Sequence, residues 1–185
     1  MKKILLYGIN EIDADLYQNV AIGYDVAMYI LNDTCMSVLV RDLFELNDDL
    51  DNMHAEAEGE YMLMDGISSE DLIVLLKAFE DAGRPFKGTV IVRTRINETW
   101  TLAKLLDEVR EEHVLMEKLN ELDEMLQDCN GIDLSAMDAS DSTELKAALL
   151  EGYLLLKDDQ QELAEVDEAI RRLRKAMEPA VKIVH

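Results

Sequence analysis

Four short apolar runs constrain the fold of this chain more than any other feature. They cover Lys3–Gly8, Asp25–Leu31, Tyr61–Asp65 and Thr89–Thr94, and each is nearly continuous rather than alternating. A strand that is apolar along its whole length is buried on both faces, which is typical of a sheet covered by helices. The runs therefore predict four strands of an α/β fold.

Three segments between these runs have helical patterns. They are Glu11–Ile22, Thr34–Leu46 and Ser69–Ala82. The third has the strongest pattern, because Ser68 stands where an N-terminal cap is expected and Asp71 follows three residues later. We therefore expect a helix after the first, second and third strands.

A polar, acidic segment, Asn47–Glu60, separates the first two strands from the last two. It indicates a linker between two β-α-β pieces, and such alternation of strands and helices favours parallel pairing. Residues 1–97 are therefore predicted to form a small, mostly parallel four-stranded sheet flanked by helices, with the acidic linker 47–60 between its two pieces.

From residue 98 onward, apolar residues recur at three- and four-residue steps, as in amphipathic helices. A gap rich in Asp, Ser and Asn, Asp128–Ser142, separates two such stretches. The second runs from about Thr143 to Met177 with an approximate heptad, as in a coiled coil, and one helix of that length would be about 50 Å long. Its apolar positions are Leu145, Leu149, Leu156, Leu163, Val166, Ile170, Leu173 and Met177. Residues 98–178 are predicted to form a long antiparallel helical hairpin.

A helix of that length cannot lie wholly on a four-stranded sheet. Its far end needs the preceding helix or another subunit to cover its apolar side. The sequence therefore predicts a homodimer that associates through the C-terminal helices.

The charge of the chain is strongly negative and unevenly distributed. The formal net charge is −22, and the stretch from Ile4 to Leu76 has 16 acidic residues and a single base, Arg41. Such a chain repels phosphate backbones and anionic lipid, so nucleic acid and membranes are not expected as partners. The acidic surface favours solubility, and it leaves a basic protein partner open.

The two cysteines, Cys35 and Cys129, are far apart and lack metal-ligand spacing. They are predicted to be free thiols in a reducing compartment. The apolar run at the start is too short for the core of a secretory signal, and no stretch approaches the roughly 18 apolar residues of a membrane span. These observations predict a cytoplasmic location.

The segment after the fourth predicted strand contains the residues with the best claim to a binding site. The candidate ligand-binding residues are Arg93, Arg95, Asn97 and Trp100. Asn97 is suited to cap the following helix, and the junction of a strand and a helix in a parallel sheet is a common place for ligands. Two arginines beside a helix N-terminus could hold an anionic small molecule. Alternatively, Asn97 only caps, Trp100 packs and the arginines pair with acidic residues.

The same junction resembles a known family. The pattern Thr94-x-x-Asn97-x-x-Trp100-Thr101-Leu102, followed by Glu112-His113, is similar to the signature of the bacterial domain-of-unknown-function family numbered thirty-seven eighty-three. The resemblance covers roughly residues 61–115, and the chain departs from it at Arg95 and Ile96, where the family usually has Pro and Thr. The family has no established function, so the resemblance implies a strand that leads through a turn into a helix and implies no activity.

The acidic linker partly imitates a calcium-binding loop. Asn47, Asp49, Asp51 and Glu58 occupy positions 1, 3, 5 and 12 of that pattern, but position 6 is Asn52 instead of the required Gly. A solvated linker is therefore predicted and no metal site, although cation binding by residues 47–60 stays open.

No catalytic residues and no cofactor are expected. The histidines, His54, His113 and His185, are scattered and form no metal-binding motif. His113 is expected to pair with Glu117, one turn further along its helix.

Two hypotheses about function follow. The first is a non-enzymatic interaction or regulatory module that self-associates through its C-terminal helices. The alternative is a protein or enzyme that binds a small anionic ligand at the Arg93–Trp100 junction.

Overall fold

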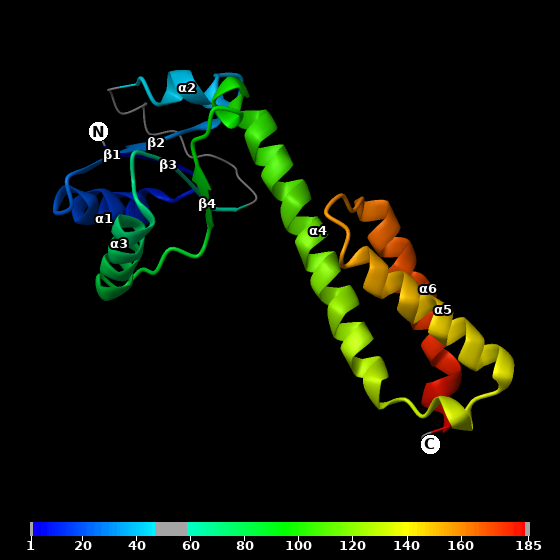
Figure 1. Cartoon of the computed structure of the whole chain (residues 1–185). Helices are drawn as coiled ribbons and strands as arrows, with labels where there is room; N and C mark the ends of the chain where they lie inside the picture. The colour runs from blue at the N-terminus through cyan, green and yellow to red at the C-terminus, as the bar shows by residue number, and fades with distance from the viewer. Residues whose placement is uncertain (1, 47–58, 184–185) are drawn as a thin grey trace. The chain divides into compact units, whose positions relative to one another are not determined.

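The computed structural model describes residues 2–46 and 59–183 (Figure 1). The chain divides into two compact units, Met1–Asp107 and Glu108–His185. The first unit contains the sheet, and the second consists of helices.

All four predicted strands are present in the sheet of the first unit. They are β1 (Lys2–Tyr7), β2 (Val26–Ile30), β3 (Tyr61–Asp65) and β4 (Thr89–Val92), in the order β2-β1-β3-β4. The pairs β1–β2 and β3–β4 are parallel, whereas β1 and β3 run antiparallel in the centre. The α/β class and the mostly parallel sheet are confirmed, and the antiparallel pair joins two parallel β-α-β pieces.

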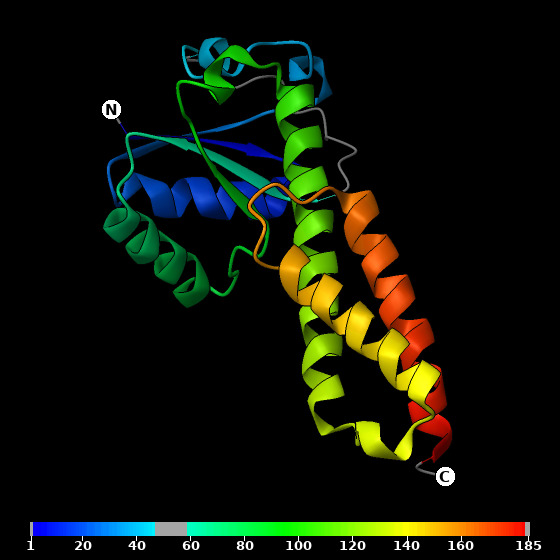
Figure 2. The ribbon, with the colours of Figure 1, turned by 45° about the vertical axis from the view of Figure 1, so that its right-hand side comes forward.

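Helices α1 (Glu11–Ile22) and α3 (Ser69–Asp81) begin where the sequence predicts, and both lie on the same side of the sheet (Figures 1 and 2). Side chains from the strands and both helices form one buried cluster, in which the rings of Tyr17 and Phe79 lie 4.5 Å apart. Asn10 and Ser68 cap the two helices by accepting hydrogen bonds from the backbone N–H groups of Asp13 and Asp71.

The prediction of a helix over Thr34–Leu46 is wrong for most of that range. A short 3-10 helix, η1 (Asp33–Cys35), is followed by a turn over residues 36–38, by Leu39 and by the one-turn helix α2 (Val40–Leu43). The segment before α2 is held by tertiary pairing, because Leu39 forms an antiparallel bridge with Thr101. The helical pattern of the sequence is local, and that long-range pairing overrides it.

The C-terminal part is helical, as predicted, but it contains three long helices. They are α4 (Leu102–Asp128), α5 (Ala139–Leu155) and α6 (Leu163–Ile183), with the short helices η3 (Cys129–Gly131) and η4 (Leu134–Ala136) between α4 and α5. The predicted single helix from Thr143 to Met177 is therefore wrong, and the second arm of the predicted hairpin consists of α5 and α6, which run antiparallel side by side (Figures 1 and 2).

The break between α5 and α6 has a local cause. The side chain of Asp158 accepts a hydrogen bond from the backbone N–H of Gln160 at 3.0 Å, and Gln161 Nε2 donates to the carbonyl of Leu155 at 3.2 Å. An Asx turn of this kind competes with a helix, and the Gln161 amide satisfies a carbonyl at the end of α5.

A second hydrophobic core holds the helical unit together. Its buried residues come from the C-terminal part of α4, from α5 and from α6, and Leu122, Leu126, Leu145, Val166 and Leu173 are fully buried. Gly152 allows α5 to approach α4 closely, because a Cβ atom there would lie 3.1 Å from Leu126 Cδ2. This core depends on sequence-distant segments, as expected of a helical bundle.

The division between the two units lies inside α4, after Asp107, whereas the helical part is predicted to begin at residue 98. The first turns of α4 belong to the α/β unit, since Leu102, Leu105 and Leu106 are buried there. Within the described part of the chain, no helix combines the length and the apolar character needed to cross a membrane.

Candidate functional site

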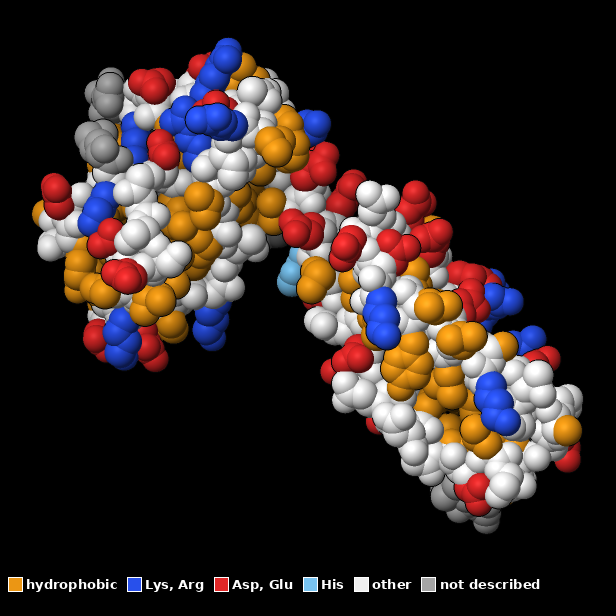
Figure 3. All heavy atoms as spheres, viewed as in Figure 1, with side chains coloured by type: hydrophobic (Ala, Val, Ile, Leu, Met, Phe, Trp, Pro, Cys, Tyr) orange, Lys and Arg blue, Asp and Glu red, His pale blue; other side chains and the backbone are white. Residues whose placement is uncertain are grey.

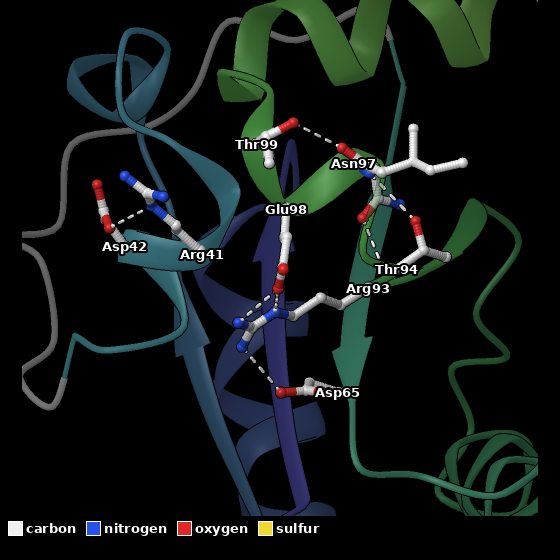
Figure 4. A network of polar contacts seen from close by, with 9 residues as sticks. Arg41, Asp42, Asp65, Arg93, Thr94, Asn97, Glu98 and Thr99 are labelled. Carbon is white, nitrogen blue, oxygen red and sulfur yellow. Dashed lines mark hydrogen bonds and ion pairs between the residues drawn. The ribbon is translucent and has the colours of Figure 1, made fainter.

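The predicted site lies at the carboxyl ends of the parallel strands β3 and β4 (Figure 4). β3 ends at Asp65, and β4 leads through Arg93 into a turn that contains the 3-10 helix η2 (Asn97–Thr99). This is the edge of a parallel pair at which ligand sites commonly form.

Asn97 closes the turn and does not cap α4. Its Oδ1 accepts from the backbone N–H of Thr94 at 2.7 Å, and its Nδ2 donates to the carbonyl of Val92 at 2.9 Å. The backbone N–H of Asn97 in turn donates to Thr94 Oγ1 at 3.1 Å. The predicted N-cap is therefore wrong: α4 starts five residues later, at Leu102, and Thr101 Oγ1 accepts from the backbone N–H of Lys104.

Arg93 is engaged by two carboxylates (Figure 4). Its Nε and Nη2 donate to Glu98 Oε2 at 3.1 and 2.9 Å, and Nη1 donates to Asp65 Oδ2 at 3.1 Å. The ring of Phe44 lies 5.5 Å below the guanidinium carbon. The hydrogen bond with Glu98 raises the pKa of Arg93 above its ordinary value, and the charge of Asp65 acts in the same direction. These contacts use three of the five N–H donors of Arg93, and the two carboxylates beside the guanidinium would repel an anionic ligand.

The backbone donors at the start of α4 are also engaged. The N–H groups of Leu102 and Ala103 donate to the carbonyls of Val38 and Met36, each at 3.0 Å. The carbonyl of Trp100 accepts from the N–H of Val40 at 2.9 Å. Helix N-termini bind anions through free N–H groups, and here the segment 36–40 uses them.

The other two predicted residues lie outside this network. Trp100 is half-buried, and Lys104 Nζ lies 4.6 Å from its ring centroid. Arg95 is exposed and forms no ion pair with any residue in the described ranges. The structure thus brings Arg93 and Asn97 into one polar network, and it leaves Arg95 and Trp100 beside it.

The partners that close the junction are not among the residues predicted from the sequence. Asp65 stands 28 residues before Arg93, and the segment 36–40 stands more than 50 residues before it. Only the position of Asp65 at the end of a strand parallel to β4 signals that it lies near Arg93.

The remaining sequence candidates contribute no second cluster. The calcium-like positions Asn47, Asp49, Asp51 and Glu58 lie outside the described residues, as do His54 and His185. His113 pairs with Glu117 at 3.2 Å, as predicted, and both side chains are largely exposed. Cys35 and Cys129 are free and buried, which confirms the prediction of two thiols. Within the described ranges, no three His, Cys, Asp or Glu side chains are grouped as metal ligands.

A different kind of surface lies between α5 and α6. Two adjoining hollows share Ala147 and Glu151 and form one groove, which we call the α5–α6 groove. Its apolar lining residues are Ala147, Ala148, Leu150, Leu154, Leu155, Ala164 and Ala176, and its charged ones are Glu144, Glu151, Asp158, Glu165, Glu168, Arg172 and Lys175. Hydrophobic side chains reach the surface of the helical unit along α5 (Figure 3). Leu150 and Leu154 are each 61% exposed, which is unusual for leucines so close together on one helix.

Comparison with known proteins identifies one segment of the chain. No curated protein and no solved structure matches the chain. The matching segment runs from the start of β3 into α4 and includes the whole Arg93–Trp100 junction, in agreement with the resemblance of the Thr94-x-x-Asn97-x-x-Trp100 pattern. Residues 60–116, just under a third of the chain, match the family model described as Domain of unknown function (DUF3783).

Proposed function

We propose that this protein is a non-enzymatic interaction module, with a regulatory role, that forms a homodimer through its C-terminal helices. The observation that carries the proposal is the uncovered apolar strip on α5. Ala147, Leu150 and Leu154 follow one another at steps of three and four residues, which is the spacing of a helix–helix seam.

The strip offers a clear gain in free energy on association. Complete burial of one leucine side chain is worth about 1.5–3 kcal/mol, and a two-fold symmetric dimer would bury the strip of both copies. The core of the helical unit uses another face of α5, where Leu145 and Gly152 are buried. The uncovered strip is therefore surplus to the packing of the single chain.

The geometry of the junction supports an interaction module over an enzyme. Arg93, Asn97 and the first N–H groups of α4 all bond to other parts of the protein. Their arrangement accounts for the recognisable sequence pattern as a means of holding β4, the turn and α4 together. Asn97 uses its side-chain oxygen and nitrogen within the fold, and three of the five N–H donors of Arg93 are used in the same way, so both residues contribute to stability.

Ligand binding at the junction is the second candidate. Its support is Arg95, which is exposed in the turn that leads to the half-buried Trp100. A thermal-shift screen with phosphates, nucleotides and carboxylic metabolites tests it, with Arg95→Ala as the control. A shift that disappears in Arg95→Ala would support the ligand hypothesis, and the absence of any shift would remove it.

A cytoplasmic location is part of the proposal, supported by the two buried free thiols. The net charge of −22 also supports a basic protein as a further partner.

The self-association is tested by measuring molar mass in solution between about 1 and about 100 μM, because dimer formation depends on concentration. The wild type is expected to approach twice the chain mass of 21.0 kDa as the concentration rises. Leu150→Asp combined with Leu154→Asp should keep the protein monomeric. Ile12→Asp combined with Ile73→Asp is the matched control, since these two exposed residues lie on the α/β unit. A wild type that stays monomeric throughout the range would refute the proposal.

A further inference from the structure

We infer that two copies of this chain dock antiparallel through the α5–α6 groove, with the acidic end of the charged row on α6 in one copy against the basic end of that row in the other. This inference rests on the proposed self-association and adds the interface and its symmetry. It follows from the order of charges along α6.

The charged residues of α6 that line the groove fall on one face and separate by sign. Glu165, Glu168, Arg172 and Lys175 follow one another at steps of three, four and three residues. The two acids stand in the N-terminal half of the helix, and the two bases follow toward its C-terminal end. The α6 wall of the groove therefore has an acidic end and a basic end, whereas on the α5 wall Glu144 and Glu151 line the same hollow as Arg172 and Lys175.

Only one orientation of two identical grooves makes these charges complementary. A two-fold axis at about the level of Ile170 sets Glu165 opposite Lys175 of the second copy and Glu168 opposite Arg172 of the second copy. Each pairing then occurs twice, as an isologous interface requires. A parallel arrangement in register would set Glu against Glu and Arg against Arg, which is unfavourable.

The groups involved can form these contacts. Lys175 is exposed and has no ion pair with another residue in the described part of the chain. Arg172 Nη1 contacts both carboxylate oxygens of Glu151, at 2.8 and 2.7 Å, and its side chain is 57% exposed. A guanidinium has five N–H donors, so Arg172 can keep Glu151 and still donate across an interface.

The contact between Arg172 and Glu151 also fixes where the apolar strip lies. Because α5 and α6 run side by side and antiparallel, the residues next to Glu151 on α5 lie near the middle of the charged row on α6. Leu150 and Leu154 are therefore close to the proposed axis, where the same residues of the second copy can cover them. An apolar centre with charged ends is the usual anatomy of a protein interface.

The test exchanges the charges in two separate variants. Variant A is Glu165→Lys with Glu168→Lys, and variant B is Arg172→Glu with Lys175→Glu. Each alone sets like charges opposite each other at all four contacts, and its dimer dissociation constant should rise by roughly tenfold or more. Mixed one to one, A and B are complementary at all four contacts, so a heterodimer should form with about the wild-type affinity.

The measurement is sedimentation of A, B and the mixture, with native mass spectrometry to identify the heterodimer. Since Glu168 and Arg172 also form ion pairs within the chain, thermal unfolding of each variant shows whether the fold is kept. If either double variant unfolds, the single changes Glu165→Lys and Lys175→Glu replace them, because neither residue has an ion pair among the described residues. Restored association in the mixture of the single variants is then the expected result.

The outcomes separate the inference from the proposed function. If the wild type is monomeric at every concentration, both fail. If Leu150→Asp with Leu154→Asp abolishes the dimer but the mixture of A and B does not associate, self-association stands and the antiparallel arrangement is overturned. A heterodimer in the mixture, together with weak association of A and B alone, supports the inference.

Discussion

The junction of the α/β unit and helix α5 of the helical unit differ in how far their side chains are used within the fold. At the junction, Arg93 and Asn97 are hydrogen-bonded to other residues of the fold, and Asn97 is only 8% exposed. In the helical unit, Leu150 and Leu154 remain 61% exposed although the core beside them is well filled. The sequence motif at the Arg93–Trp100 junction thus stabilises the fold, while α5, which has no such motif, leaves apolar surface available for binding.

The largest expected effect contrasts two leucines of the helical unit. Leu126 is fully buried against Gly152, so Leu126→Ala should lower the free energy of unfolding by about 2–5 kcal/mol. Leu150→Ala should change it by no more than about 0.5 kcal/mol, because Leu150 is exposed in the single chain. Chemical denaturation followed by circular dichroism, at a concentration where the protein is monomeric, measures both. Equal effects would mean that α5 packs differently from the structure described.

An intermediate effect is expected at the junction. Asn97→Ala would leave the N–H of Thr94 and the carbonyl of Val92 without partners, and an unpaired buried polar group costs about 1–3 kcal/mol. Asn97→Asp is a companion variant that keeps the acceptor for Thr94 but sets a carboxylate oxygen against the carbonyl oxygen of Val92, so it should also lower the free energy of unfolding at pH 7. The single tryptophan, Trp100, lies in this unit, so its fluorescence follows unfolding of the α/β unit alone. If Asn97→Ala unfolds like the wild type, the turn does not depend on this side chain.

The smallest effect concerns the pH dependence of the α/β unit. Arg84 Nε donates to Asp13 Oδ2 at 2.8 Å and Nη2 donates to Glu60 at 2.5 Å. Burial alone would raise the pKa of Asp13, but the hydrogen bonds from Arg84 and Asn10 outweigh it and lower the pKa below the ordinary value. A carboxyl whose pKa is lower in the folded state adds stability above its unfolded pKa and loses it as the pH falls through the folded pKa.

Asp13→Asn should therefore lower the free energy of unfolding at pH 7. Below about pH 4, where the wild type becomes less stable, the variant should lose less of its free energy of unfolding. Tryptophan fluorescence during urea unfolding at several pH values measures this. Arg84→Ala should weaken the same pH dependence, since it removes the group that lowers the pKa of Asp13. An unchanged pH profile in both variants would show that this ion pair contributes nothing to folding.

Local patterns were enough to predict the regular elements of the α/β unit. The four strands, α1 and α3 begin and end within about two residues of the predicted positions, because continuous apolar runs and capping residues act within one element. The pairing of His113 with Glu117 also follows from spacing on one helix. The family match over residues 60–116 agrees with the predicted motif for the same reason, since the motif lies within one stretch of chain.

What the sequence by itself determined is therefore the class of fold, its strands, its acidity and the helical character of everything after the junction. Only the tertiary structure decided that the segment 36–40 pairs with the start of α4, that Arg93 is bound by Asp65 and Glu98, and that α5 and α6 fold against each other. These outcomes depend on contacts between residues far apart in the chain, and their free energies exceed the small local preferences that a sequence pattern records.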